Sequence, residues 1–257
     1  MNSKMSGKKK IILTMTLLLV IAGLGSFVYI SDYYHSAVGN EIYLESSETV
    51  EVKEIKEGLF FDGIGNEKAL IFYPGGKVEY TAYAPIVRGL AENGIDCFLV
   101  KMPGNLAVFG MNKAEGIMER YGGYKDWYMA GHSLGGAMAA SYVAEHLEDF
   151  AGLVLLGAYT TESLIPKAEN GNEGREDFWV CVMYGSEDRV MNGKKLSESY
   201  ALMPKRFHEE SLTGGNHAQF GNYGIQKGDG IATMPQEEQW QYAIDIISEH
   251  IMLEAEN

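Results

Sequence analysis

Hydrophobic and polar residues follow two alternating patterns along most of the chain. Short apolar runs, typical of strands buried on both faces, alternate with segments in which apolar residues recur at helical spacing. In residues 79–94, for example, Tyr83, Ile86 and Leu90 share this spacing, and Gly94 ends it. The pattern predicts strands at residues 50–55, 58–61, 68–76, 95–103, 126–131, 151–159, 178–185 and 207–212. It predicts helices at residues 79–94, 112–122, 134–146, 194–203 and 237–253.

Strands that alternate with helices predict an α/β fold, with a mostly parallel central sheet and helices on both faces. In such sheets, binding and catalytic sites gather at the carboxyl ends of the strands. The residues that directly follow the predicted strands are therefore the first candidates for chemistry.

The N-terminal region carries a separate signal. Residues 11–30 form an uncharged, apolar run, and a helix of that length is about 30 Å long, which matches the core of a bilayer. Lysines precede the run and acids follow it, which places the N-terminus in the cytoplasm and the remainder outside. The alternative is a cleaved signal peptide, with Gly23-Leu24-Gly25 as its cleavage site. The apolar run continues past this site to Ile30, which favours an uncleaved anchor.

The predicted organisation has four parts: a basic cytoplasmic N-terminus (residues 1–10), a transmembrane signal-anchor (residues 11–30), a spacer (residues 31–50) and one α/β domain (residues 51–257). A chain of 257 residues suits one compact domain with a tail. We expect a single-pass protein of the cell membrane with an extracytoplasmic domain, or a secreted protein if the N-terminal segment is cleaved.

The charge excludes one class of partner. The formal net charge is −14, and the charges ahead of Asp32 are all lysines, so the remainder is more acidic still. Such a surface repels the phosphate backbone of nucleic acids and anionic lipid headgroups. We therefore expect no nucleic-acid partner. The composition does not indicate an oligomeric state.

A serine between two glycines lies at the junction of a predicted strand and a predicted helix. Residues 131–135 read Gly-His-Ser-Leu-Gly and fit the pattern G-x-S-x-G. The pattern alone is weak, but a strand before it and a small-residue helix after it are the context of a nucleophile elbow. The sharp turn requires small neighbours and holds the hydroxyl of Ser133 above the sheet edge. The alternative is an ordinary turn with an incidental serine.

A serine nucleophile needs a base, and the base needs an orienting acid. Asp188 follows the predicted strand at 178–185 and is the candidate acid, with Glu187 and Glu162 as rivals. His217 lies in a glycine-rich loop after the last predicted strand and is the candidate base. The chain order of serine, acid and histidine agrees with this architecture.

Two backbone N–H groups should stabilise the negative charge that develops on the substrate oxygen. One belongs to Leu134, directly after the serine. The other belongs to Gly76 or Lys77, in the glycine loop after the predicted strand at 68–76. His132 and Gln219 are possible pocket residues beside the serine and the histidine.

Other chemistries find no support in the sequence. His, Cys and acidic residues do not converge at metal-ligand spacing, and Gly63 and Gly65 precede a strand rather than the helix of a dinucleotide site. We expect no metal and no cofactor. Cys97 and Cys181 fall in two separate strand runs and are expected to be buried free thiols rather than a disulfide.

The chain resembles the α/β-hydrolase superfamily from about residue 51 to its C-terminus. GHSLGG, GSEDRV and GGNH occur in the family's order, with YPGGK ahead of them. YPGGKVEYTAYAPI, VKMPGNLAVFG and GGNHAQFGNYGIQKGDG resemble the compact fold-5 group, close to dienelactone hydrolases. The resemblance implies a triad of Ser133, Asp188 and His217, and serine here replaces the cysteine of dienelactone hydrolases proper.

The resemblance also bears on the edges of the site. Many relatives carry a large cap between the strands at 151–159 and 178–185. Here residues 160–177 are short and polar, which predicts little or no cap domain. The loop at 220–232 follows the base and is expected to border the pocket. In the family's strand order, Cys97 and Cys181 lie several strands apart, which supports free thiols.

These features together predict a membrane-anchored, extracytoplasmic serine hydrolase. Its expected substrate is a carboxylic ester, either a small molecule or an acyl group at the cell surface. An amidase or peptidase with the same triad is the enzymatic alternative. The alternative from another class is a non-catalytic binding protein on a hydrolase scaffold.

Overall fold

The computed structural model describes residues 7–65, 67–166, 175 and 177–253. The chain divides into two units, which meet between Tyr33 and Tyr34. The first unit contains one helix, α1 (Gly7–Ser31), whose described apolar side chains are exposed except for Ile30, which is partly buried. By length and composition, α1 is able to cross a membrane, and a signal sequence would pass the same test.

The second unit is built on one sheet, which has eight strands in the described part of the chain. The strands are β1 (Glu51–Ile55), β2 (Gly58–Asp62), β3 (Lys68–Tyr73), β4 (Asp96–Val100), β5 (Asp126–His132), β6 (Gly152–Leu156), β7 (Trp179–Gly185) and β8 (Arg206–Leu212). Their spatial order is β1-β2-β4-β3-β5-β6-β7-β8. β2 is antiparallel to β1 and β4, and the remaining neighbours pair in parallel. The predicted, mostly parallel sheet is confirmed.

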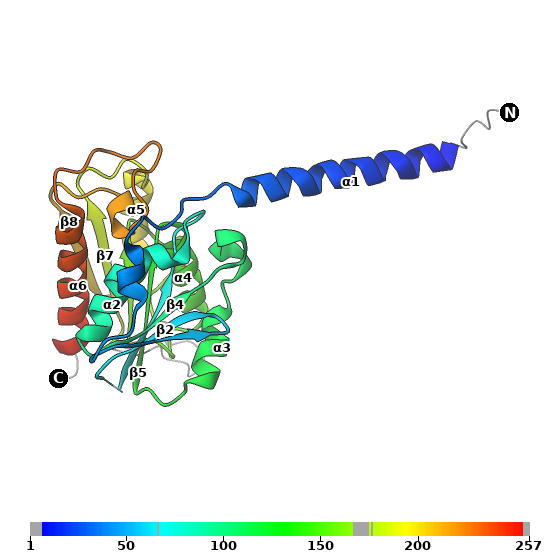
Figure 1. Cartoon of the computed structure of the whole chain (residues 1–257). Helices are drawn as coiled ribbons and strands as arrows, with labels where there is room; N and C mark the ends of the chain where they lie inside the picture. Colours follow the sequence, from blue (N-terminus) through cyan, green and yellow to red (C-terminus); the bar gives the residue numbers. More distant parts are fainter. Residues whose placement is uncertain (1–6, 66, 167–174, 176, 254–257) are drawn as a thin grey trace. The chain divides into compact units, whose positions relative to one another are not determined.

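Helices cover both faces of the sheet (Figure 1). α2 (Ala84–Glu92) and α6 (Gln236–Leu253) pack on one face, and α3 (Lys113–Arg120), α4 (Leu134–Glu145) and α5 (Gly193–Ser199) on the other. Because successive side chains of a strand point to opposite faces, a central strand must be apolar at every position. In β3, Leu70 and Phe72 enter one core while Ala69 and Ile71 enter the other. The unbroken apolar runs of the sequence have this cause.

Some predicted helices are shorter in the structure because their ends adopt 3-10 geometry. Residues 79–94 form a 3-10 turn, η2 (Tyr80–Tyr83), before α2 begins at Ala84. Pro85 explains the boundary, since proline is favoured in the first helical turn and restricts the residue before it. The other 3-10 segments are η1 (Asn40–Leu44), η3 (Pro103–Asn105), η4 (Ala107–Phe109), η5 (Tyr200–Leu202) and η6 (Ala218–Phe220).

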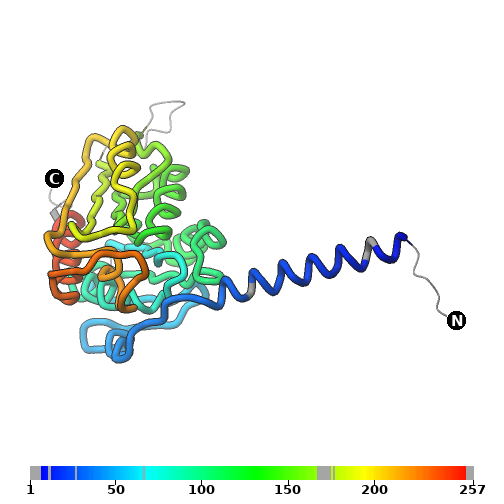
Figure 2. The backbone as a smooth tube through the Cα atoms, turned by 90° about the horizontal axis from the view of Figure 1, so that it is seen from above, coloured from blue at the N-terminus to red at the C-terminus, as the bar shows by residue number. Residues whose placement is uncertain are grey.

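The segment expected to be a spacer, residues 31–50, lies on the domain from Tyr34 onward. The N–H of Tyr34 donates to the carbonyl of Lys77 at 2.8 Å, and that of Ala37 donates to Asn222 at 2.8 Å. Asn40 is buried. In Figure 2 this blue segment runs beside the orange segment near residue 220. Because main-chain hydrogen bonds hold this segment, its sequence shows no periodic pattern of apolar residues. The folded domain therefore begins near residue 34.

Both cysteines are free and buried, as the sequence analysis expects. Cys97 lies in β4 and Cys181 in β7, with three strands between them. Burial raises the pKa of Cys97 well above its usual value and that of Cys181 to about 12. At neutral pH both thiols are therefore protonated and unreactive.

The connection between β6 and β7 was predicted to lack a cap. Its described residues, 157–166, 175, 177 and 178, form neither helix nor strand. Residues 167–174 and 176 lie outside the described part of the chain.

Candidate active site

Ser133 is the single residue between β5 and α4. Its backbone has φ 52° and ψ −122°, a conformation that residues other than glycine rarely adopt. Its N–H donates to the carbonyl of Leu156 at 2.9 Å, which ties the turn to the end of β6. A conformation of this kind costs about 1–3 kcal/mol and persists where the surroundings impose it. Such strain is typical of a functional turn.

The glycines around Ser133 are required by close backbone packing. A Cβ on Gly131 would lie 2.7 Å from the carbonyl carbon of Gly135. On Gly135 it would lie 2.2 Å from the carbonyl oxygen of Pro74, and on Gly136 it would lie 2.6 Å from the Cβ of Ala158. The G-x-S-x-G spacing therefore reflects contact between β5, α4 and the loop after β3.

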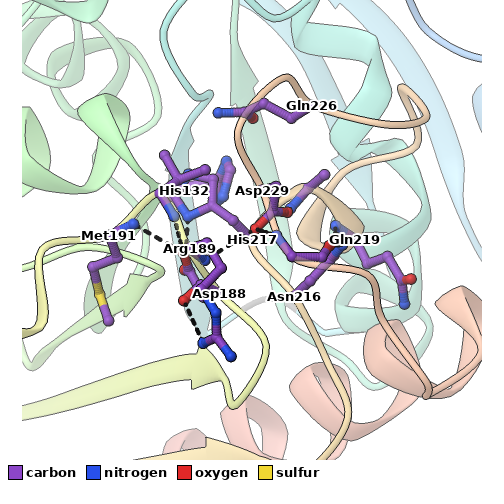
Figure 3. Close-up of polar contacts among 12 residues, drawn as sticks. His132, Asp188, Arg189, Met191, Asn216, His217, Gln219, Gln226 and Asp229 are labelled. Atoms are coloured by element: carbon purple, nitrogen blue, oxygen red, sulfur yellow. Dashed lines mark hydrogen bonds and ion pairs between the residues drawn. The ribbon is translucent and has the colours of Figure 1, made fainter.

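His217 and Asp188 form a buried pair at the carboxyl edge of the sheet. His217 precedes η6, in the loop after β8, and Asp188 lies in the loop after β7. His217 Nδ1 lies 2.8 Å from Asp188 Oδ2, and the side chains are 1% and 2% exposed (Figure 3). Asp188 Oδ1 accepts the N–H groups of Val190 and Met191, each at 2.8 Å. Both oxygens of this carboxylate thus have hydrogen-bond partners within the protein.

The environment keeps Asp188 ionised. Burial by itself would raise its pKa, but the hydrogen bond and charge of His217 and the two amide donors outweigh burial, so the pKa lies below its usual range. An ionised carboxylate accepts a hydrogen bond, so the proton of the neutral imidazole lies on Nδ1. His217 Nε2 is then the basic nitrogen. Among the described residues it has no hydrogen-bond partner.

The rival acids lie elsewhere. Glu187 Oε2 lies 3.1 Å from Arg189 Nη2. The backbone N–H of Glu162 donates to the hydroxyl of Thr160 at 3.0 Å. Within the described residues, Asp188 is the acid that contacts His217.

A second carboxylate joins the two loops that carry this pair. Asp229 Oδ2 accepts the N–H of Ala218, directly after His217, at 2.8 Å. Asp229 Oδ1 accepts the N–H of Arg189, directly after Asp188, at 3.2 Å. Figure 3 shows Asp229 beside His217, with Gln226 farther away. The sequence analysis did not identify this role, because loop acids carry no local signal for such a contact.

His132 is part of a buried hydrogen-bond chain. The N–H of Gly75 donates to the hydroxyl of Tyr83 at 3.1 Å, and that hydroxyl lies 2.8 Å from His132 Nδ1. The ring of His132 lies 4.4 Å from that of His217, between centroids. Burial, and then the charge of His217, lower the pKa of His132 well below its usual value, so it is neutral. The sequence analysis missed Tyr83, which links the glycine loop to the elbow.

A cavity of about 400 Å³ opens beside Ser133 and His217. Its other lining residues come from α4, from the loops after β6 and β7, and from the start of α5: Leu134, Ala137, Met138, Gly157, Ala158, Tyr159, Thr161, Val190, Met191, Asn192 and Lys195. Counting the two alanines, apolar and aromatic side chains outnumber the polar ones along this wall, which suits an apolar group.

His132 and Gln219 do not line this cavity, nor do the residues of the loop 220–232. His132 is 1% exposed and lies beneath the site. The Gln219 amide donates to the carbonyl of Met234 at 3.0 Å. These two residues were expected in the pocket, but His132 Nδ1 and the Gln219 side-chain NH₂ instead form hydrogen bonds within the protein, where they support the loops around the site.

The glycine loop after β3 presents one unpaired donor. The N–H of Lys77 donates to the carbonyl of Asn105 at 2.7 Å, which removes it as a candidate. Among the described residues, the N–H groups of Gly76 and Leu134 have no acceptor. The two residues are close, because a Cβ on Gly76 would lie 2.8 Å from Leu134 Cδ2.

Comparisons with known proteins bear on the family and the fold. The sequence model of the alpha/beta hydrolase family matches residues 69–241. Among solved structures, the monoacylglycerol lipase of Paleococcus ferrophilus is 12% identical with a TM-score of 0.57, over 78% of this chain and 99% of that one. Carboxylesterase CesB of Bacillus subtilis is 11% identical with a TM-score of 0.53, over 83% and 94%. Carboxyl esterase 2 of Tuber melanosporum is 11% identical with a TM-score of 0.56, over 84% and 89%.

No curated protein matches the sequence at a significant level. At these low identities the structural likenesses show the fold, and the narrower resemblance to dienelactone hydrolases stays a prediction. The sequence match covers most of the chain and includes the elbow, the acid and the histidine. The chain belongs to the alpha/beta hydrolase family.

Proposed function

We propose that the protein is a serine hydrolase that cleaves carboxylic esters through Ser133, His217 and Asp188. The observation that carries the proposal is the buried pair of His217 and Asp188, 2.8 Å apart, on the cavity that Ser133 also lines. A strained serine, a histidine with a free nitrogen and a fixed carboxylate are the parts that acyl transfer needs.

The proposed reaction has two halves. Ser133 Oγ attacks the ester carbonyl while His217 Nε2 takes the hydroxyl proton, and the imidazolium returns this proton to the leaving alcohol. Water then attacks the acyl-serine, with His217 again as base, and releases the acid and Ser133. Asp188 holds the imidazole and stabilises its charged form.

The oxyanion of each tetrahedral intermediate needs donors that are already in place. We assign this role to the N–H groups of Gly76 and Leu134. Leu134 is the first residue of α4, where N–H groups have no partner within the helix. The contact of Tyr83 with Gly75 holds the loop that presents Gly76.

The wall of the cavity supports an ester with an apolar acyl group. Met138, Met191 and Val190 offer adaptable apolar contact. The described part of the loop after β6 forms no cap, so we expect the site to be accessible. Solved relatives of this fold include carboxylesterases and monoacylglycerol lipases.

We also propose that α1 anchors the enzyme in the membrane, with the catalytic domain on the extracytoplasmic side. The uncharged run at 11–30 and the lysines ahead of it support this topology. A signal peptide cleaved after Gly25 would release the same domain instead.

Ester turnover tests the function directly. The protein is assayed on p-nitrophenyl esters of increasing acyl length, beside Ser133→Ala and Ser141→Ala. Ser141 lies in α4, the helix that begins directly after Ser133, and its hydroxyl donates to the carbonyl of Ala137, so it is a matched control. We expect Ser133→Ala to lose at least about 10³-fold in kcat/KM and Ser141→Ala to stay near wild type.

Two outcomes would contradict the ester assignment. Turnover of peptide anilides without turnover of esters would indicate an amidase. A folded wild-type protein inactive on both would indicate a binding protein.

A further inference from the structure

Exposed apolar side chains gather at the edge of the sheet that carries the candidate active site. Beyond α1, ten large hydrophobic side chains are exposed in the described part of the chain. Five of them belong to loops at the carboxyl ends of β4, β7 and β8, and a sixth, Val38, follows Ala37, whose N–H donates to the carbonyl of Asn222 in the β8 loop. We call these six the apolar rim: Val38, Val108, Phe109, Val190, Ile225 and Ile231.

Three members of the apolar rim are almost fully exposed. Val38 is 102% exposed, Ile225 93% and Ile231 88%. Isolated exposed apolar residues are common, but several at the sheet edge that carries a candidate active site are a candidate interaction surface.

Two members of the apolar rim adjoin the catalytic machinery. Val190 lines the cavity and donates its N–H to Asp188. Ile231 follows Gly230, whose carbonyl accepts the side-chain amide of Asn216, the residue before His217. A surface that covers the apolar rim would therefore also cover the mouth of the site.

The chain connects this same edge to the apolar N-terminal run. Tyr34 pairs with Val78, in the loop that contains Gly76. Asp32 and Tyr33 alone separate Tyr34 from Ser31, where α1 ends. Three residue steps reach at most about 10–11 Å, whatever the orientation of the two units. If α1 spans a bilayer, covalent length keeps the loop beside the active site near the bilayer surface.

We propose that the apolar rim docks on the lipid bilayer and that the enzyme takes its substrate from it, as an amphiphilic ester with a long acyl chain. This inference rests on the proposed function and names its substrate class. Because the protein is acidic, with net charge −14, docking relies on insertion of apolar side chains rather than on anionic headgroups. Binding should therefore occur on zwitterionic lipid and should not strengthen with anionic lipid.

Vesicle binding by the domain, without α1, tests the proposal. Both hydrophobic cores are made of residues between Val50 and Ile251, so a fragment of residues 34–257 keeps them complete. The fragment is sedimented with phosphatidylcholine vesicles, beside Ile225→Ser/Ile231→Ser and a control, Ile42→Ser/Ile64→Ser. Ile42 lies beside Arg88 of α2 and Trp240 of α6, and Ile64 precedes β3, so the control changes exposed apolar residues outside the apolar rim.

We expect the rim variant to lose at least about tenfold in vesicle partitioning, while the control stays near wild type. Phosphatidylserine in the vesicles should not increase binding. No binding of the wild-type fragment, or equal loss in both double variants, would overturn the proposal. Binding that appears only with phosphatidylserine would overturn apolar insertion as its basis.

Activity separates this inference from the proposed function. On a short, soluble p-nitrophenyl ester, both double variants should match wild type. On a long-chain diacylglycerol in phosphatidylcholine vesicles, the rim variant of the full chain and of the fragment should release fatty acid about tenfold more slowly. Equal rates on the vesicle substrate would overturn docking. If the wild-type protein hydrolyses no ester, the proposed function is contradicted. The sedimentation experiment would still test docking.

Discussion

At the scale of single residues, Asp188 decides which nitrogen of His217 carries a proton. One carboxylate oxygen faces His217 Nδ1, and the other accepts two backbone N–H groups. The two amide donors fix the orientation of the carboxylate. An asparagine in this position would have to keep its amide oxygen toward the N–H groups of Val190 and Met191. It would therefore present its NH₂ group, a donor, to the imidazole.

Asp188→Asn should therefore disable the base. The amide oxygen would stay with the two backbone donors, and the NH₂ group would face His217 Nδ1, which forces the proton onto Nε2. We expect kcat on p-nitrophenyl esters to fall about 10³–10⁴-fold, with little change in KM. Glu187→Gln is the control, since its carboxylate contacts Arg189, and it should remain active. Activity of Asp188→Asn close to wild type would contradict the assignment.

His132 should make the protein less stable in mild acid. Its pKa is depressed in the folded protein, so below about pH 6.5 the unfolded state binds a proton that the folded state does not. The contribution of His132 to the free energy of unfolding is therefore complete above pH 6.5. As the pH falls below this value, the free energy of unfolding decreases by up to about 1.4 kcal/mol per pH unit.

The variant His132→Asn keeps an acceptor for Tyr83 and removes the titration. Urea denaturation at pH 7.5 and 5.5 should show a larger loss of unfolding free energy in wild type than in the variant. Equal losses in the two proteins would contradict a buried, neutral His132.

The residues of the proposed triad could be selected from the sequence because each follows a recognisable strand in a characteristic order. Asp229 and Tyr83 could not, because their contacts join positions far apart in the chain. The choice between Gly76 and Lys77 likewise depended on Asn105, which takes the N–H of Lys77. Local patterns place reactive groups, and long-range hydrogen bonds decide which of them are free.

At the scale of elements, the junction of β5 and α4 depends on the absence of a side chain at Gly135. Gly135→Ala should destabilise the protein by about 1–3 kcal/mol and lower activity, because its Cβ meets the backbone of Pro74 at 2.2 Å. Gly116→Ala, in α3, is the matched change: its Cβ meets Glu57 Oε1 at 3.7 Å, an ordinary contact.

Gly116→Ala should therefore stabilise by about 0.5–1 kcal/mol, since alanine favours a helix. Thermal or urea denaturation measures both changes. The same sign for the two variants would show that close packing at the elbow is not what requires glycine.

The helices and strands were predictable because each pattern has one physical cause, burial on one face or on both. The ends of these helices and strands were less predictable. Residues 79–94 read as one helix, yet Pro85 limits α2 to Ala84–Glu92 and leaves a 3-10 turn before it. That turn buries Tyr83, the residue that contacts His132.

At the scale of the whole molecule, the sequence analysis and the structure differ most at residues 34–50. This segment lacks a periodic pattern, yet it binds the loops that follow β3 and β8 through its backbone. The consequence is a short connection, Asp32 and Tyr33, between α1 and the domain. A long, flexible spacer would have allowed the domain to move away from any membrane that α1 spans.

The N-terminal segment should remain attached. The full chain should sediment with membranes, resist extraction at alkaline pH and keep its N-terminal peptide in mass spectrometry, because the apolar run continues through Ile30. A chain lacking residues 1–33 should be soluble. A soluble product of the full-length gene that begins after Gly25 would show cleavage and contradict the anchor.

The central claim is that Ser133 is a nucleophile activated by His217. The most direct measurement is reaction with a fluorophosphonate probe, followed by mass spectrometry of the labelled peptide. We predict one adduct per chain, located on Ser133, absent in Ser133→Ala and retained in Ser141→Ala. A folded wild-type protein that does not react, or an adduct on another residue, would contradict the assignment of this site.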